Sequence, residues 1–275
     1  MLRVHTLFSG STGNCIYIKN DDTEILIDAG KSCGATEKAL NSIGTSLSNI
    51  KEIFITHEHC DHTAGLEIIS KKYNIPVHMT APSYDKYVRS GTNLERMATR
   101  EDVAYEKSVG SLSISSFPVP HDSVQNVGFI ISSQGDTFGI ATDIGHITST
   151  VAESLSLCKR VIVESNHDIK MVENGPYPRF LKERILSDGG HLSNEKCATL
   201  CAYLCDKGVC ELTLAHLSQE NNLPKLAYET VRSHLDKCGF ENTPLKVAFP
   251  EIAVCATNGK SYPYPIISDG GKRSE

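Results

Sequence analysis

Three histidines and an aspartate lie within six consecutive positions in the first quarter of the chain. They are His57, His59, Asp61 and His62, in the stretch "FITHEHCDHTAG" at residues 54–65. Neutral imidazole nitrogens and carboxylate oxygens are ligands that suit Zn²⁺, Mn²⁺ or Fe²⁺. The same residues could instead form a hydrogen-bonded polar turn. A metal site would require further ligands from distant parts of the chain.

Three later apolar runs end in residues that could complete such a site. "FPVPHD" offers His121, "GIATDIG" offers Asp143 and "LTLAHLS" offers His216. Taken alone, each residue is more typical of a satisfied structural position. Taken with the first cluster, they predict two metals. The predicted ligands are His57, His59 and His121 for one ion, Asp61, His62 and His216 for the other, and Asp143 as a bridge.

Short apolar runs rich in β-branched residues alternate with helical patterns along the chain. Strands are predicted at 15–18, 24–28, 52–57, 75–79, 112–119, 126–132, 138–143, 160–165, 212–216 and 245–249. Helices are predicted at 36–43, 62–73, 81–89, 150–157, 178–187, 194–206 and 224–237. This alternation predicts an α/β protein in which two sheets lie between helical layers. The candidate ligands would then lie at strand ends.

Length and composition favour one large domain. With 275 residues and no linker, we predict a domain at 1–257 and a loosely ordered tail at 258–275. No apolar run approaches the roughly 18 residues of a membrane span. The start of the chain turns polar too early for a signal peptide, which favours a cytoplasmic protein. The ten cysteines are therefore expected to be reduced thiols.

Cys197, Cys201 and Cys205 recur every four residues and could form a cluster site or the buried face of a helix. Helical spacing with neighbouring leucines favours the buried face.

The net charge of -6 argues against binding nucleic acid by bulk electrostatics, although local basic sets could contribute. These sets, which could equally be solvated helix faces, are Lys71 and Lys72, then Arg89, Arg96 and Arg100, then Arg179, Lys182 and Arg184.

The run from His57 to His62 resembles the H-x-H-x-D-H hallmark of the metallo-β-lactamase superfamily. "LIDAG" with Asp28, then His121, Asp143 and His216, match in order over nearly the whole chain. The resemblance implies an αββα sandwich of the metallo-β-lactamase type, with two mixed sheets flanked by helices. It also implies two divalent transition-metal ions, of zinc, manganese or iron. Asp28 would support the metal loop through backbone hydrogen bonds without touching a metal.

Other residues indicate which branch of the superfamily the chain resembles. True β-lactamases lack a histidine at the place of His62 or an aspartate at the place of Asp143, so antibiotic hydrolysis is disfavoured. Glyoxalase-II-like thioesterases carry a "GHTxG" sequence where this chain has "VPHDSVQNVGF", so thioester hydrolysis is disfavoured as well. This sequence, with Gly128 seven residues after His121, resembles the phosphodiesterase branch that includes tRNase Z. "LFSGSTGNC", "ESNHD" with His167, and "AHLSQENN" resemble the YycJ (WalJ) group, single-domain enzymes taken to be DNA exonucleases.

The resemblance to tRNase Z also assigns Glu164 and His191. His191 opens a predicted helix, where it could donate a proton while Glu164 orients its ring. Alternatively, His191 only caps that helix. The loop "SGSTGNC" could hold phosphate through backbone amides or form a tight turn. The resemblance places it at the rim of the site. The expected substrate contacts are Ser11, Asn14, His146 and His167, of which the last two could instead stabilise loops.

The function implied is metal-dependent hydrolysis of phosphodiester bonds, in which a hydroxide that bridges the two metals would be the nucleophile. The resemblance also implies that the substrate is DNA and that it is degraded from 5′ to 3′. Asp61 would ligate a metal and orient that nucleophile, and Glu164 and His191 complete the expected catalytic set. Two alternatives stay open. One is a phosphodiesterase for small cyclic or dinucleotide substrates, which the acidic charge favours. The other is a non-catalytic, metal-stabilised partner protein. No membrane partner is expected.

Overall fold

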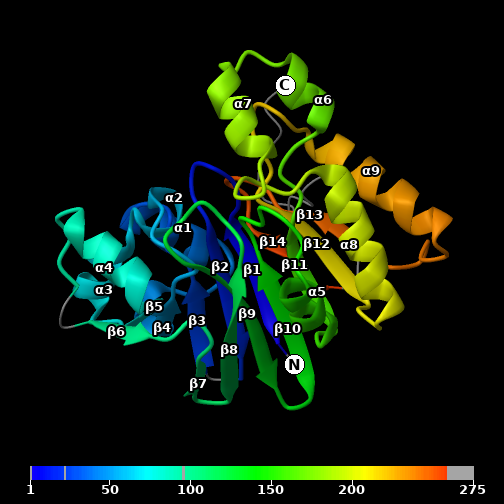
Figure 1. The fold of residues 1–275 in the computed structure, drawn as a ribbon. Helices are drawn as coiled ribbons and strands as arrows, with labels where there is room; N and C mark the ends of the chain where they lie inside the picture. Colours follow the sequence, from blue (N-terminus) through cyan, green and yellow to red (C-terminus); the bar gives the residue numbers. More distant parts are fainter. Residues whose placement is uncertain (1, 22, 95–96, 259–275) are drawn as a thin grey trace, which may run out of the picture.

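The computed structural model describes residues 2–21, 23–94 and 97–258. In these residues the strands form two seven-stranded sheets (Figure 1). The first sheet has the order β14-β1-β2-β3-β4-β5-β6. Its strands are β1 (Arg3–Phe8), β2 (Cys15–Asn20), β3 (Thr23–Ile27), β4 (Ile50–Phe54), β5 (Val77–Thr80), β6 (Ala98–Glu101) and β14 (Val254–Cys255).

The second sheet has the order β13-β12-β11-β10-β9-β8-β7. Its strands are β7 (Glu106–Val109), β8 (Leu112–Val119), β9 (Asn126–Ser133), β10 (Asp136–Ala141), β11 (Arg160–Glu164), β12 (Glu211–Ala215) and β13 (Leu245–Val247). Each sheet is mixed: β3 to β6 run parallel in the first, and β10 to β13 run parallel in the second.

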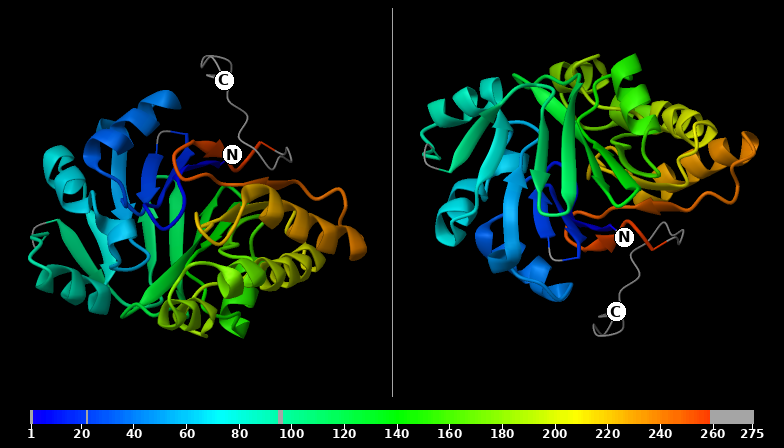
Figure 2. Two further views of the ribbon diagram at one scale, coloured as in Figure 1. Left: turned by 90° about the horizontal axis from the view of Figure 1, so that it is seen from above. Right: turned by 90° about the horizontal axis from the view of Figure 1, so that it is seen from below.

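Helices cover the outer face of each sheet, as the two end-on views of Figure 2 show. The first sheet packs on α1 (Cys33–Ser42), α3 (Leu66–Tyr73) and α4 (Ala81–Arg89) through one apolar cluster. The second packs on α5 (Ser149–Ser156), α8 (Asn194–Asp206) and α9 (Pro224–Lys237) through another. A third cluster, including Phe54 and Phe129, fills the space between the sheets. The predicted sandwich of two mixed sheets flanked by helices is therefore confirmed.

Several helices begin where their sequence provides a cap. Ser32 accepts a hydrogen bond from the backbone of Ala35 at the start of α1, and Thr148 and Ser193 do the same for α5 and α8. Such caps satisfy backbone N–H groups that have no partner within the helix. The short helices α2 (Cys60–Thr63), α6 (Ile169–Asn174) and α7 (Arg179–Leu186) and the 3₁₀ turn η1 (Leu47–Asn49) complete the fold.

Parallel strands bring their carboxyl ends to one edge of the sandwich. β3 and β4 end there in the first sheet, and β10, β11 and β12 end there in the second. Because β8 and β10 are both antiparallel to β9, β8 runs in the same direction as β10. The segments after these strands carry the candidate ligands. Figure 1 shows α6 and α7 projecting beyond this edge.

The domain limits 1–257 stay a prediction. The predicted tail at 258–275 lies outside the described residues except for Asn258. Among the described residues, no helix combines the length and apolar character needed to cross a membrane.

Candidate metal centre

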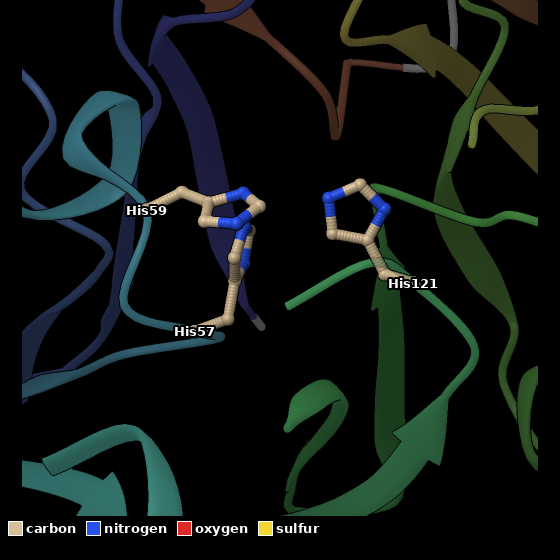
Figure 3. Close-up of side chains that lie close together, drawn as sticks. All are labelled: His57, His59 and His121. Atoms are coloured by element: carbon tan, nitrogen blue, oxygen red, sulfur yellow. The ribbon is translucent and has the colours of Figure 1, made fainter. Parts of the chain in front are cut away.

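His57, His59 and His121 converge at the edge of the sandwich (Figure 3). His57 and His59 follow β4, and His121 follows β8 in the other sheet. The ring centroids lie 4.6 Å apart for His57 and His59, and 5.2 Å from His121 to each of them. One potential ligand atom from each residue lies within 4.8 Å of the others. The geometry brings together the three residues predicted to share one ion.

Asp61, His62 and His216 form the second predicted group. Their ligand atoms also lie within 4.8 Å of one another. His62 Nδ1 lies 2.8 Å from Asp28 Oδ2. A carboxylate oxygen accepts, so Nδ1 donates and Nε2 faces Asp61 Oδ2 at 3.4 Å. A partner that fixes one ring nitrogen and leaves the other for a cation is typical of metal-binding histidines.

Asp143 lies between the two groups. Its Oδ2 is 3.2 Å from His62 Nε2, and its Oδ1 is 3.7 Å from His121 Nε2 and 3.6 Å from His216 Nδ1. Asn126 holds this turn because its side-chain amide donates to the backbone carbonyls of Thr142 and Asp143. Asp143 therefore has the position predicted for a bridging residue.

Backbone conformation sets this edge apart. Asp28, Asp143 and His216 have φ values of 63°, 56° and 55°. Residues other than glycine seldom adopt positive φ, and each such residue costs roughly 1–3 kcal/mol when the surroundings hold it there. Each of the three lies one or two positions after the end of a strand. Their strained turns aim carboxylate and imidazole groups at the same place.

The donor set fits divalent cations. His57 Nε2, Asp143 Oδ2 and His216 Nε2 are buried, and among the described residues none has a hydrogen-bond partner. Buried polar atoms without partners are costly, and two cations that share Asp143 would satisfy all three. Nitrogen and carboxylate oxygen ligands suit a borderline transition metal such as zinc or manganese better than calcium or magnesium. The residues present are therefore suited to such ions.

Glu164 is fully buried and receives four hydrogen bonds. Its Oε1 lies 2.9 Å from Nδ1 of both His191 and His216. Its Oε2 accepts from the backbone N–H groups of Ile144 at 2.7 Å and Leu192 at 2.9 Å. These four bonds use the accepting capacity of a carboxylate, so the grouping of Glu164 with Asp143, His191 and His216 does not describe a metal site. Glu164 instead orients two histidines, whereas the sequence predicted one.

The electrostatics of this edge favour positive charge. Burial lowers the pKa of His216, but Asp143, Asp61 and Glu164 outweigh burial and raise it to about 10. Burial opposes ionisation of Glu164, yet His191 and His216 lower its pKa to about 2. His57 differs because burial, its largest influence, lowers its pKa well below the ordinary value. The same carboxylates that attract protons would attract divalent cations.

Asp28 makes the predicted backbone hydrogen bond and one further contact. Its Oδ1 accepts from the backbone N–H of Thr56 at 2.8 Å, and its Oδ2 binds the ring of His62. The backbone bond agrees with the expectation that Asp28 supports the metal loop, and the contact to His62 was not foreseen. Gly30 is also essential here, because a Cβ at this position would lie 1.7 Å from the carbonyl oxygen of Asp61.

The four expected substrate contacts separate in the structure. Ser11 is exposed at the rim, and His146 is half-buried with its Nδ1 2.9 Å from the carbonyl oxygen of Asp188. Asn14 is only 6% exposed, and its amide nitrogen lies 3.0 Å from His62 Nε2 and 3.3 Å from Asp61 Oδ2. His167 is 1% exposed. Both residues are buried, and their substrate contacts stay predictions.

Sequence patterns missed two residues that assemble the site. Glu58 lies inside the hallmark, and its carboxylate accepts from the Ser83 hydroxyl at 3.1 Å and from the backbone of Val124 at 2.9 Å. It ties the first histidines to α4 and to the loop after His121. Thr56 bonds Asp28 and lies 3.0 Å from His57 Nδ1. The only sequence signal for either was position beside a candidate ligand.

The cysteine stripe lies on the buried face of α8, as predicted. Cys197, Cys201 and Cys205 are all buried, and no disulfide joins cysteines of the described chain. The Sγ atoms of Cys197 and Cys201 are 3.8 Å apart, and the pKa of Cys201 is raised by its bond with Cys197 and by burial. These thiols pack against the second sheet rather than opening to solvent.

The basic sets are partly engaged by acidic groups. Arg100 pairs with Asp85 at 2.8 Å, and Arg184 pairs with Asp122. Arg179 pairs with Glu183 at 2.7 Å, and Lys71 pairs with Glu67. Arg89 is exposed at the end of α4, whereas Arg96 lies outside the described residues. None of these sets supplies a candidate ligand.

The fold and the metal centre define the class. Residues 23–217 match the family model described as the β-lactamase superfamily domain. The chain therefore belongs to the metallo-β-lactamase superfamily and is a metal-dependent hydrolase.

Two curated relatives give the group within it. The chain is 32% identical over 240 residues to exodeoxyribonuclease YycJ of Bacillus anthracis, covering 87% of this chain and 91% of the relative. It is 31% identical over 233 residues to exodeoxyribonuclease WalJ of Streptococcus pneumoniae, covering 83% and 86%. These matches support membership of the YycJ (WalJ) group.

Solved structures agree on the fold. YhfI from Bacillus subtilis, a metallo-β-lactamase fold protein, matches with a TM-score of 0.69 at 11% identity, covering 92% of this chain and 99% of that one. The short form of human tRNase Z matches with a TM-score of 0.64 at 17% identity, covering 93% and 99%. At such low identity these likenesses establish the architecture alone.

Proposed function

We propose that the chain is a dinuclear phosphodiesterase that acts as a DNA exonuclease, from 5′ to 3′. The observation that carries the proposal is the convergence of two ligand groups on Asp143, together with the relatives named as exodeoxyribonucleases. One cation, zinc or manganese, would be held by each group. The proposed ligands are His57, His59 and His121, then Asp61, His62 and His216, with Asp143 shared.

Divalent cations held here would polarise a phosphoryl group and make water a stronger nucleophile near neutral pH. Asp61 would orient that water, because its Oδ2 lies between His62 Nε2 and His216 Nε2 and at 18% exposure remains accessible. Asp143 and His57 are almost fully buried and would exclude bulk water from the back of the site. The reaction breaks one P–O bond and forms another with the oxygen of water.

His191 would donate the proton that the leaving oxygen needs. Its Nδ1 lies 2.9 Å from Glu164 Oε1, so the opposite side of the ring, which includes Nε2, is available to a substrate. Its side chain is 20% exposed, unlike that of His216 at 2%. A positioned acid of this kind contributes roughly 10²–10⁴-fold. Glu164 acts through His191 and His216 and is a positioning residue.

We also place the enzyme in the cytoplasm, because ten cysteines without a disulfide suit a reducing compartment.

The test is a comparison of substrates. The purified chain is stripped with chelator, reloaded with Mn²⁺ or Zn²⁺, and given single-stranded DNA, duplex DNA and RNA labelled at either end, beside a panel of cyclic mono- and dinucleotides. We expect metal-dependent release of nucleotides from the 5′ end of DNA. Hydrolysis of the cyclic panel with DNA left intact would favour the small-molecule alternative. No turnover of any substrate with metal bound would favour a non-catalytic partner protein.

A further inference from the structure

A cavity of about 180 Å³ opens beside the proposed proton donor. His191 and Ser11 line its inner side, and residues from the α6–α7 segment line its outer side. This segment projects beyond the sheets in Figure 1. No residue of α7 is buried, so the helix does not contribute to the core. The cavity, at the edge of the metal centre, is therefore built by an element that the core does not require.

The walls combine an aromatic ring, aliphatic groups and hydroxyls. Tyr177, Leu181 and Ile185 supply the apolar surface, and Ser11 and Ser218 supply the hydroxyls. The three apolar side chains are half-buried, so they retain surface for a ligand. Apolar walls with a few polar groups are typical of sites for planar organic ligands, including nucleobases that stack on aromatic rings.

The charged residues that line the cavity favour a nucleobase over a phosphate as its ligand. Arg184 is the only lysine or arginine among the residues that line this cavity, and its Nε donates to Asp122 Oδ2. Asp122 also lines the cavity and is fixed by its own N–H, which donates to the carbonyl oxygen of Gly189 at 2.9 Å. The guanidinium is therefore already neutralised. A phosphate would need an uncompensated cation, whereas an uncharged base does not.

The position of His191 indicates which nucleoside of the substrate would lie at the cavity. In the proposed reaction water attacks phosphorus, the bond between phosphorus and the 3′-oxygen of the 5′-terminal nucleoside breaks, and His191 gives a proton to that oxygen. Because His191 also lines the cavity, the group nearest the cavity is the nucleoside that carries the leaving oxygen. We propose that the cavity under α7 binds the base of this terminal nucleoside. The inference rests on the proposed function and adds a specificity pocket to it.

The experiment removes the base or fills the cavity. Single-stranded oligonucleotides carry either thymidine or an abasic tetrahydrofuran at the 5′ end, and kcat/KM is measured for wild type, Leu181→Trp and Tyr177→Ala. Base stacking in such sites is substantial, so wild type should prefer the thymidine end by roughly 10- to 100-fold. Both variants should lower this ratio toward one, because the contribution of the base to kcat/KM is lost.

The control is Leu157→Trp, the same change at a residue that follows α5 and is 72% exposed. It should keep the wild-type ratio. Binding of free thymidine by calorimetry, weak but measurable in wild type and abolished in Leu181→Trp, tests the cavity without turnover. Cleavage of both ends at equal rates by wild type, with no thymidine binding, would overturn the pocket alone. Thymidine binding without any metal-dependent cleavage would overturn the proposed function and keep the pocket.

Discussion

Glu164 shows how one buried carboxylate can organise two different groups. It fixes His216, a candidate ligand, and His191, a candidate acid, through the same oxygen atom. The other oxygen holds the backbone after Asp143 and after His191. Because all four bonds converge on a fully buried group, the orientation of both rings depends on one side chain.

The two histidines bound to Glu164 should respond differently to substitution. His216→Ala should lower metal content and turnover together, because the substitution removes a buried ligand atom. His191→Ala should keep both metals and lower the rate on DNA by roughly 10²–10⁴-fold, as expected for removal of an acid. Elemental analysis and steady-state kinetics measure the two effects.

A nitrophenyl phosphodiester provides the control for this pair. Its leaving group needs no proton, so the defect of His191→Ala should shrink on it, whereas the defect of His216→Ala should not. Equal defects of His191→Ala on both substrates would remove the proton-donor role. A lower metal content in His191→Ala would show that the assignment of the two histidines is reversed.

At the residue scale, the sequence indicated the candidate metal ligands more readily than the residues that hold those ligands in place. His57, His59, Asp61 and His62 are close in the chain, and the remaining candidates each end an apolar run. Asn14 was expected at the substrate, and in the structure it lies against His62. Its role depends on a contact between residues 48 positions apart, which composition and spacing do not encode. The ligand roles themselves stay proposals until the metals are measured.

At the scale of elements, the loop after β3 and the hallmark loop approach too closely for side chains. Gly30→Ala would place a Cβ against the carbonyl oxygen of Asp61, and neither backbone can move without disturbing Asn14 or His62. Overpacking of this kind typically costs roughly 1–3 kcal/mol. We expect a lower free energy of unfolding in urea and weaker metal binding, because Asp61 would shift.

Gly34→Ala is the matched control. Gly34 lies in α1, and nothing lies within 4 Å of the position of its added Cβ. Alanine is the better helix former by about 1 kcal/mol, so this variant should be neutral or slightly more stable. Wild-type stability and metal affinity in Gly30→Ala would contradict the close packing of the two loops.

Elements with strong patterns were predicted well, and four strands with weak patterns were missed. The helices at 81–89, 194–206 and 224–237 agree with α4, α8 and α9. The strands β1, β6, β7 and β14 were missed; the last three lie at the edge of a sheet and have at most four residues, whereas β1 lies inside the first sheet and its apolar run is interrupted by His5 and Thr6. A half-exposed edge strand has no apolar run to reveal it. The helix predicted at 62–73 divides into α2 and α3 at Gly65, where an added Cβ would meet the carbonyl oxygen of Lys31.

At the scale of the whole molecule, a net charge of -6 requires that DNA binding use local positive groups. Neutralising Arg89, Arg96 and Arg100 together should weaken DNA binding and flatten its salt dependence. For single strands, the log–log slope should change by about 0.7 for each phosphate that the variant no longer neutralises. Arg100 already pairs with Asp85, which should reduce its share. Filter binding from low to moderate salt measures the slope.

Lys225 and Lys237 on α9 provide the surface-charge control, since that helix covers the outer face of the second sheet. Their neutralisation should leave the slope unchanged. An unchanged slope in the arginine variant as well would assign Arg89, Arg96 and Arg100 to a solvated face.

The central claim is that two cations, held by ligands from both sheets, make the chain a phosphodiesterase. Stripped protein is titrated with Mn²⁺ or Zn²⁺ while bound metal and DNA hydrolysis are measured together, in wild type and in His59→Ala. We predict that wild-type activity rises until two equivalents are bound, and that His59→Ala loses at least one equivalent and its activity, because its partners His57 and His121 no longer complete the site. Full activity in stripped wild type, or in a fully loaded His59→Ala protein, would contradict the claim.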